Sequence, residues 1–214
     1  MTRSSPVIDL NEATTLLENG GVLSYPTETF YALGVDPRNE DAVSKLLSIK
    51  GRDGNQGVSL IVDSAERVCE WLSEDGDGLR IRREAVLQQF WPGPLTIVIA
   101  LNEQVKEKFS AQIFGPRETL AVRLAPTRLG TELARSVGGG ITATSANPKG
   151  QSPAASEEQV HGYFPTIPVV RDRIGGASSG KHFDRPSTIL DVSRLPFTIL
   201  REGAISAREL APWL

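Results

Sequence analysis

Hydrophobic positions along this chain follow two alternating periods, which indicates an α/β protein. The segment Pro37–Lys50 carries apolar residues at helical spacing, with acidic residues early and a lysine at its end. Leu95–Leu101 is instead a continuous apolar run of strand length. The same criteria predict further strands at Val22–Tyr25, Val58–Val62, Leu120–Leu124, Ile141–Ala143, Ile167–Val170, Ser187–Val192 and Phe197–Leu200. Further helices are predicted at Asp9–Gly20, Ser64–Leu72, Leu79–Phe90, Thr127–Val137, Glu157–Gly162 and after Ser206.

Several of these strands follow one another without an intervening helix, so regular β-α-β winding is not expected. The pattern predicts a mixed sheet flanked by helices. The chain has 214 residues, of which 39% are hydrophobic and 23% charged, as is ordinary for one globular domain. The length suits one domain, or one domain with a short appendage, and we expect a single domain over residues 1–214.

The cysteine content and the length of the apolar runs indicate the cellular compartment of the protein. The single cysteine, Cys69, excludes an internal disulfide and a cysteine-cluster metal site, and it fits a reducing cytoplasm. The first ten residues lack the apolar stretch of a secretory signal, and no apolar run is long enough to span a membrane. A cytoplasmic protein is the expectation.

Motifs of several common enzyme classes are absent. The sequence has no G-x-x-x-x-G-K-[ST], no G-x-G-x-x-G after a strand and no G-x-S-x-G. Its two histidines, His161 and His182, do not have the spacing of a zinc site. Candidate chemistry therefore rests on polar residues at the ends of apolar strands.

Basic residues mark two candidate anion sites. Lys50 and Arg52 are two residues apart, and in an extended chain they would point to one side and suit a polyphosphate. The alternative is a lysine that stabilises a helix C-terminus. Arg123 lies inside an apolar strand and needs a partner, such as the carboxylate of a ligand, unless one face of that strand is wet.

Small hydroxyl and amide side chains mark strand ends. Ser145 and Asn147 follow an apolar strand and offer donors and acceptors, or they form a turn before Pro148. Ser187 and Arg201 lie at strand ends near the C-terminus. This inventory of cations and hydroxyls, without a nucleophile–base pair, suggests a reaction on a nucleotide that works by positioning and electrostatics.

The stretch Tyr25–Gly34, "YPTETFYALG", combines polar and aromatic residues in a way that neither a core strand nor a simple turn requires. A turn led by proline is one interpretation. The other is a site wall, in which Thr29 and Tyr31 face one cavity and Phe30 packs behind them. Glu28 then either balances nearby cations or orients Thr29.

Seven segments occur together in one order: "YPTETFYALG", "KGRDGNQGVSLIV", "FWPGPLTIVI", "LAVRL", "TATSAN", "STILD" and "ILREGAI". Their combination resembles the YrdC-like family over roughly residues 11–205. The best-known members are L-threonylcarbamoyladenylate synthases. The resemblance implies a twisted, mixed β-sheet flanked by helices around a large, positively lined cavity. It also implies synthesis of threonylcarbamoyl-AMP and pyrophosphate from L-threonine, bicarbonate or CO₂, and ATP, for threonylcarbamoyladenosine modification of tRNA.

The resemblance implies roles for individual residues. Those expected to bind threonine are Thr29, Tyr31, Arg123, Ala143 and Ser187. Those expected to bind ATP are Lys50, Arg52, Gln56, Thr119, Ser145, Asn147 and Arg201, of which Lys50 and Arg52 are also the candidate catalytic residues. Mg²⁺ is expected on the phosphates of ATP, with no metal site formed by the protein itself.

The chain departs from the family in two ways. Asp53 stands where many relatives have proline, and Gly57-Val58 and Ile61 stand where longer relatives have Pro-Leu and a histidine that contacts threonine. The chain also ends soon after "ILREGAI", so the C-terminal domain of the longer synthases is expected to be missing. A short enzyme of this kind is expected to work with the proteins that transfer the threonylcarbamoyl group to tRNA. The loop Gly175–Pro186, rich in glycine and serine, is a candidate lid over the site. The alternative functions are a maturation factor that binds double-stranded RNA or tRNA, and a YrdC-like paralogue with another nucleotidyl-transfer substrate. A net charge of −3 disfavours RNA binding, whereas local clusters of arginine favour it.

Overall fold

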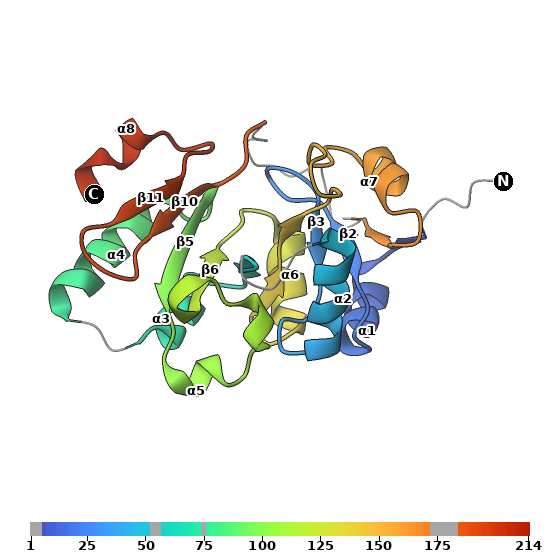
Figure 1. Ribbon diagram of the computed structural model, residues 1–214, viewed down its shortest axis with the longest axis horizontal. Helices are drawn as coiled ribbons and strands as arrows, with labels where there is room; N and C mark the ends of the chain where they lie inside the picture. The colour runs from blue at the N-terminus through green and yellow to red at the C-terminus, as the bar shows by residue number, and fades with distance from the viewer. Residues whose placement is uncertain (1–5, 52–56, 74–75, 172–183) are drawn as a thin grey trace.

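The strands of this protein form two mixed sheets with helices on both sides (Figure 1). The computed structural model describes residues 6–51, 57–73, 76–171 and 184–214. The first sheet has the strand order β1 (Val7–Ile8), β9 (Val169–Val170), β2 (Leu23–Tyr25), β3 (Ala32–Gly34) and β8 (Thr144–Ser145). The second has the order β11 (Thr198–Arg201), β10 (Thr188–Asp191), β5 (Leu95–Ala100), β6 (Thr119–Arg123), β4 (Leu60–Val62) and β7 (Gly140–Thr142).

The two sheets are connected directly where β7 passes into β8. Thr142 is paired with Leu60 in the second sheet, whereas Thr144 is paired with Leu33 in the first. Ala143 lies between them and donates its backbone N–H to the carbonyl of Ser59, 2.7 Å away. The crossing places the ends of strands from both sheets next to one another.

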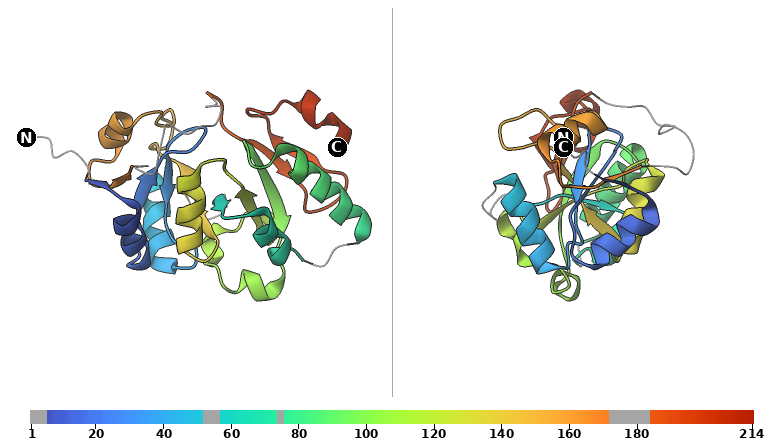
Figure 2. Two further views of the ribbon diagram at one scale, coloured as in Figure 1. Left: turned by 180° about the vertical axis from the view of Figure 1, so that it is seen from behind. Right: turned by 90° about the vertical axis from the view of Figure 1, so that its right-hand side faces the viewer.

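Two layers of helices cover the sheets, as the end-on view in Figure 2 shows. Leu60 and Ile61 in β4 point to opposite faces because successive side chains alternate along a strand. Leu60 joins the core under α2, whereas Ile61 joins the core formed with α1 and α6. The described helices of at least one α-helical turn are α1 (Leu10–Glu18), α2 (Glu40–Lys50), α3 (Ala65–Trp71), α4 (Asp77–Phe90), α5 (Glu103–Lys106), α6 (Arg128–Ser136), α7 (Glu157–Tyr163) and α8 (Ala207–Leu210).

Local signals in the sequence explain where several helices begin and end. A capping box of Asp9 and Glu12 opens α1, and one of Ser206 and Glu209 opens α8. Gly51, with φ of 55°, ends α2 in the left-handed conformation that glycine adopts most easily. The prediction of a mixed α/β fold is confirmed, and none of the described helices is long and apolar enough to cross a membrane.

The structure differs from the sequence-based expectation in how the strands are grouped. They divide between two sheets, and β1, β3 and β8 were not predicted. These strands have two or three residues, too few to show a period of two. β3 is the end of the "YPTETFYALG" stretch, so this stretch is a loop that leads into a strand.

Candidate active site

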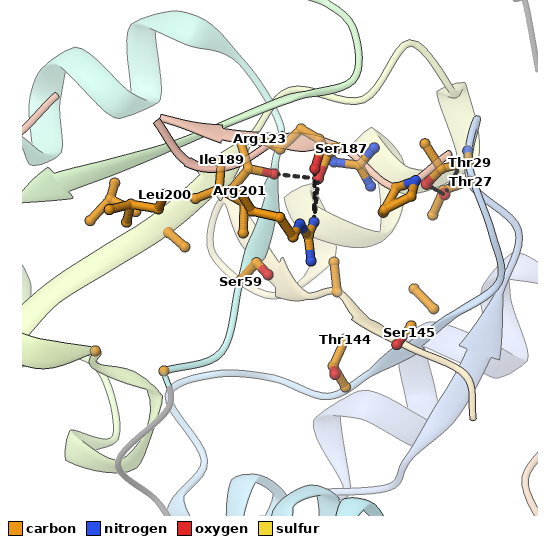
Figure 3. Close-up of a pocket in the computed structure, with 18 of the residues that line it drawn as sticks. Thr27, Thr29, Ser59, Arg123, Thr144, Ser145, Ser187, Ile189, Leu200 and Arg201 are labelled. Atoms are coloured by element: carbon orange, nitrogen blue, oxygen red, sulfur yellow. Dashed lines mark hydrogen bonds between the residues drawn. The ribbon is translucent and has the colours of Figure 1, made fainter. Parts of the chain in front are cut away.

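A cavity of about 560 Å³ lies where the two sheets meet (Figure 3). One wall is formed by alternate residues of β10, β5 and β6, whose side chains share one face of the second sheet. The opposite side is formed by the 27–32 segment and by β8 with the residue before it. The wall residues from the second sheet are Ser187, Ile189, Asp191, Thr96, Val98, Thr119, Ala121 and Arg123.

The wall combines polar and apolar side chains. Val98 is paired with Ala121 on one side and with Asp191 on the other, and Ile189 is paired with Thr96, one step closer to Arg123. Arg123 ends β6 and Thr119 begins it. These two residues are four positions apart, or about 13 Å. An elongated ligand could therefore place two different polar groups at the two ends.

Arg123 is buried at one end of the wall and forms an ion pair with Glu28. Its Nη1 donates to Oε1 of Glu28, and the two side chains are 8% and 0% exposed. Burial lowers the pKa of Arg123 to about 10, partly opposed by the nearby Tyr25, with the positive charge of Arg201 acting in the same direction as burial. The guanidinium is therefore still charged at neutral pH.

The Glu28 contact decides between the interpretations that the sequence left open. Glu28 balances a cation, and the Arg123 side chain is itself buried although its face of β6 lines the cavity. The other carboxylate oxygen, Oε2, is buried and has no hydrogen-bond partner among the described residues. The partner of Arg123 is thus provided within the chain, and a ligand carboxylate would have to share this guanidinium with Glu28.

The two threonines that flank Glu28 fix the loop that carries it. Thr27 and Thr29 share a hydrogen bond of 3.1 Å between their hydroxyl groups, drawn in Figure 3, and the Thr27 hydroxyl also contacts the carbonyl of Phe30 at 2.7 Å. Thr29 and Tyr31 both line the cavity, as predicted from their spacing. Phe30 was expected to pack behind them, but it lines the cavity too, because this segment is a bent loop without strand alternation.

Lys50 is turned toward the backbone after β8. Its Nζ donates to the carbonyls of Ser145 and Asn147, at 2.6 and 2.5 Å, and to Oδ1 of Asn147 at 3.1 Å. Lys50 is only 3% exposed and lies outside the cavity lining. It is the last residue of α2, so the extended geometry assumed for Lys50 and Arg52 does not hold at Lys50. In this structure its ammonium group fixes the 145–147 segment.

Asn147 completes the same connection. Its Oδ1 accepts from Oγ of Ser145 at 2.6 Å, and its Nδ2 donates to the carbonyl of Gln151 at 2.6 Å. Ser145 lines the cavity and Asn147 does not. The Ser145–Asn147 pair is therefore a turn whose serine faces the cavity.

Arg201 and Ser187 lie at the same end of the cavity as Arg123. Nη2 of Arg201 donates to the carbonyl of Ser187 at 2.8 Å, and the hydroxyl groups of Ser187 and Thr96 share a hydrogen bond of 2.8 Å (Figure 3). Because Thr96 is buried in the wall, this hydrogen bond fixes the Ser187 side chain.

Most of the predicted site residues come together around this cavity. Those in the lining are Thr29, Tyr31, Thr119, Arg123, Ala143, Ser145, Ser187 and Arg201. Lys50 and Asn147 support the lining from behind. Arg52 and Gln56 lie outside the described residues, as does most of the candidate lid, Gly175–Pro186. Ile61 is fully buried in the core with α6 and is not part of the lining. The individual roles assigned to these residues stay predictions.

The sequence analysis missed one prominent pair at the far end of the wall. Nη2 of Arg117 donates to Oδ2 of Asp191 at 2.9 Å, and the two side chains are 52% and 7% exposed. Asp191 lies within the predicted strand Ser187–Val192, on the same face as Ser187, and this alternation was the available signal. Arg117 gave no signal, because its place depends on a turn in which Arg117 and Glu118 have φ of 61° and 57°. Each left-handed residue costs about 1–2 kcal/mol.

The described residues offer little to a metal ion directly. They contain no group of three or more histidine, cysteine, aspartate or glutamate side chains that could bind a metal ion. Asp191 is the only carboxylate in the described lining, and both its oxygens accept hydrogen bonds. A divalent cation in this cavity would therefore depend on the ligand for most of its coordination.

The fold and the cavity define an α/β protein with an arginine-lined cavity between two sheets. Comparison with protein families gives its place among such proteins. The model of the Sua5/YciO/YrdC family, described as telomere recombination, matches residues 15–203. The chain belongs to this family.

Individual relatives agree with this assignment. A threonylcarbamoyl-AMP synthase of Halorhodospira halophila is 36% identical over 184 residues, which cover 85% of this chain and 89% of that protein. One from Thiobacillus denitrificans is 36% identical over 178 residues, 83% of this chain and 87% of that protein. P. abyssi Sua5 complexed with L-threonine has a TM-score of 0.79 and 26% identity, covering 95% of this chain. This chain spans 56% of that protein's length.

Proposed function

We propose that this protein forms threonylcarbamoyl-AMP and pyrophosphate from L-threonine, bicarbonate or CO₂, and ATP. The observation that carries the proposal is the buried, charged Arg123 in the cavity wall, beside the hydroxyl groups of Ser187 and Thr96. It is supported by family membership and by relatives that are threonylcarbamoyl-AMP synthases.

The Arg123 end of the cavity is assigned to threonine. The guanidinium binds the substrate carboxylate and shares its charge between that group and Glu28. Thr29, Tyr31 and Ser187 surround the remainder of the amino acid, and the backbone at Ala143 completes the pocket. Hydroxyl groups at these positions suit the hydroxyl of threonine, because a site built for a hydrogen bond rejects an analogue that lacks it.

ATP is assigned to the remaining length of the cavity. Thr119 and Ser145 line it, Arg201 lies where it meets the threonine end, and Arg52 and Gln56 are predicted to join them. Lys50 and Asn147 act through Ser145, because their hydrogen bonds fix the backbone that presents its hydroxyl group. Mg²⁺ enters as part of the substrate, on the phosphates, in keeping with its preference for phosphate oxygens and water.

The reaction follows from positioning. The amine of threonine attacks CO₂ and loses a proton, which gives a carbamate. A carbamate oxygen then attacks the α-phosphorus of ATP, and the bond to the β-phosphate oxygen breaks to release pyrophosphate. Arginine side chains offset the negative charge that gathers on the phosphates, so no nucleophile of the protein is needed. The walls must also keep water from the mixed anhydride.

The product would serve threonylcarbamoyladenosine formation in tRNA, through separate proteins that transfer the threonylcarbamoyl group. Under this proposal the protein need not bind RNA itself. A steep loss of RNA affinity with rising salt would instead indicate a binding protein with many phosphate contacts.

Pyrophosphate release tests the proposal. The protein is incubated with Mg²⁺, ATP and bicarbonate, and L-threonine is compared with L-serine, L-valine and no amino acid. We expect release that depends on threonine and bicarbonate together, with less from serine and least from valine. Release that does not depend on threonine would contradict the proposed function.

A further inference from the structure

The turn before β6 holds an arginine in the cavity by means of an uncommon backbone. Arg117 and Glu118, neither of them glycine, both have positive φ, 61° and 57°. Strained residues of this kind persist where surrounding contacts enforce them, and they concentrate at functional sites. Here the strain directs the Arg117 side chain into the cavity lining.

Three contacts enforce the turn. The Thr119 hydroxyl donates to the carbonyl of Pro116 at 2.9 Å, and the N–H of Gly115 donates to the carbonyl of Thr119 at 2.8 Å. An ion pair joins Glu118 to Lys106 of α5 on the outer side. The turn is thus fastened by its neighbours independently of Arg117's own ion pair.

The two members of the Arg117–Asp191 pair differ in freedom. Asp191 is fixed by Ser193, whose N–H and hydroxyl donate to Oδ1 at 3.0 and 2.6 Å. Arg117 is 52% exposed and reaches Asp191 through Nη2. Of the two, Arg117 is the one that can turn to another anion, with Asp191 as its partner in the absence of ligand.

The position of Arg117 decides which anion this is. Arg117 precedes Thr119 at the end of β6 opposite Arg123, and Thr119 and Arg123 are about 13 Å apart along the strand, so a group bound at Arg117 lies away from the threonine carboxylate. The anionic groups that ATP offers at such a distance are its phosphates. A planar guanidinium matches the geometry of phosphate oxygens.

We propose that Arg117 is a further ATP-binding residue, which exchanges the carboxylate of Asp191 for a phosphate oxygen of the nucleotide. This assignment rests on the proposed function. It also makes Asp191 a competitor of the nucleotide for Arg117. Loss of the arginine should therefore weaken phosphate binding, whereas loss of the aspartate charge should strengthen it.

Binding of inorganic tripolyphosphate, measured by titration calorimetry with the full chain at low salt, tests the assignment. Arg117→Asn removes the guanidinium while keeping a residue that tolerates positive φ. Arg80→Asn is its matched control, because it removes the same charge from an exposed arginine outside the lining of this cavity. We expect about tenfold weaker binding for Arg117→Asn and no change for Arg80→Asn.

Asp191→Asn shows whether Asp191 competes with phosphate for Arg117 or only holds the arginine in place. Asparagine can still accept the hydrogen bonds from Ser193, but it no longer competes as an anion. We expect this variant to bind tripolyphosphate about twofold more tightly. Weaker binding in both Arg117→Asn and Asp191→Asn would overturn the proposal, as would equal binding by wild type and Arg117→Asn.

A failure of the Arg117 assignment can be distinguished from a failure of the proposed function. Threonine-dependent pyrophosphate release without tripolyphosphate binding would overturn the Arg117 assignment and leave the activity standing. The expected pattern of tripolyphosphate affinities without threonine-dependent release would support Arg117 as a phosphate ligand and contradict the activity.

Discussion

Two arginine–carboxylate pairs lie at opposite ends of one cavity wall, and they differ in burial. Arg123 and Glu28 are 8% and 0% exposed, whereas Arg117 and Asp191 are 52% and 7% exposed. Breaking a buried pair leaves an uncompensated charge in a low-dielectric interior, whereas an exposed arginine can be solvated by water. The first pair is therefore part of the architecture, and the second can change partners.

The difference has a consequence for binding at each end. A ligand carboxylate at Arg123 adds to a charge arrangement that is already fixed, so the guanidinium is oriented before the ligand binds. A phosphate at Arg117 instead replaces an existing contact. We expect mutations at the first pair to affect folding and mutations at the second to affect ligand affinity.

The largest effect is expected for Glu28→Ala, which leaves Arg123 charged and buried. The free energy of unfolding should fall by about 3–5 kcal/mol. For a chain of this size that corresponds to a fall in Tm of about 10 °C. Urea unfolding followed by circular dichroism measures the change.

Glu28→Gln is the control for this variant, because it keeps an oxygen that accepts a hydrogen bond from Arg123. It should lose clearly less stability than Glu28→Ala. If Glu28→Ala lowers the free energy of unfolding by less than about 1 kcal/mol, the buried pair contributes no more than an exposed ion pair. The two ends of the cavity wall would then not differ as described.

The next effect concerns the support behind the cavity. Lys50→Met keeps the apolar stem but leaves the carbonyls of Ser145 and Asn147 without their buried donor. We expect a loss of about 2–3 kcal/mol of stability and weaker ATP binding. Lys45→Met is the control on the same helix, since Lys45 is exposed and its Nζ reaches the carbonyl of Gly20 at 3.3 Å. Equal stability of the two variants would contradict the anchoring role of Lys50.

The pH dependence of stability sharpens the description of the buried end. Tyr25 is buried near Arg123, and its hydroxyl donates to the carbonyl of Thr142 at 2.9 Å. Burial raises the pKa of Tyr25, only partly opposed by the charge of Arg123. Because the pKa is higher in the folded state, this contribution to stability is present below about pH 10 and is lost as the pH rises above the value for unfolded tyrosine.

Comparison of wild type with Tyr25→Phe isolates this group from others that titrate in the same range. Between pH 8 and pH 11 the wild type should lose about 1.4 kcal/mol more of its unfolding free energy than the variant. The same loss in both proteins would mean that Tyr25 ionises as easily in the folded state, and that its surroundings admit water.

The smallest effect on stability is expected at the exposed pair. Arg117→Gln should change the free energy of unfolding by less than about 1 kcal/mol, because a half-exposed ion pair contributes little. Urea unfolding under the conditions used for Glu28→Ala gives a direct comparison. A loss as large as that of Glu28→Ala would show that both pairs are architectural.

The sequence contained most of the secondary structure because capping residues and long apolar runs are local signals. Asp9 with Glu12 and the run Leu95–Leu101 are examples that the structure confirms. The division into two sheets was not predictable, because it depends on strands as short as Thr144–Ser145 and on the crossing at Ala143. Which strands pair is a long-range property that no local pattern records.

The candidate site shows the same limit. Arg123 could be recognised because a charge in an apolar strand needs a partner, but its contact with Glu28 bridges residues 95 positions apart in the sequence. Lys50 was recognised as a residue of the site, yet its hydrogen bonds to the 145–147 segment follow from how α2 packs. Arg117 was missed altogether, since two consecutive residues with positive φ are not expected without glycine.

The most direct test of the central claim follows the carbon atom of bicarbonate. The protein is incubated with Mg²⁺, ATP, L-threonine and either ¹³C-labelled or unlabelled bicarbonate, and the nucleotides are analysed at once by mass spectrometry. We predict a new adenylate with the mass of threonylcarbamoyl-AMP, heavier by about 1 Da when the bicarbonate is labelled. Without threonine the adenylate should not form. Pyrophosphate release with no labelled adenylate would contradict the account.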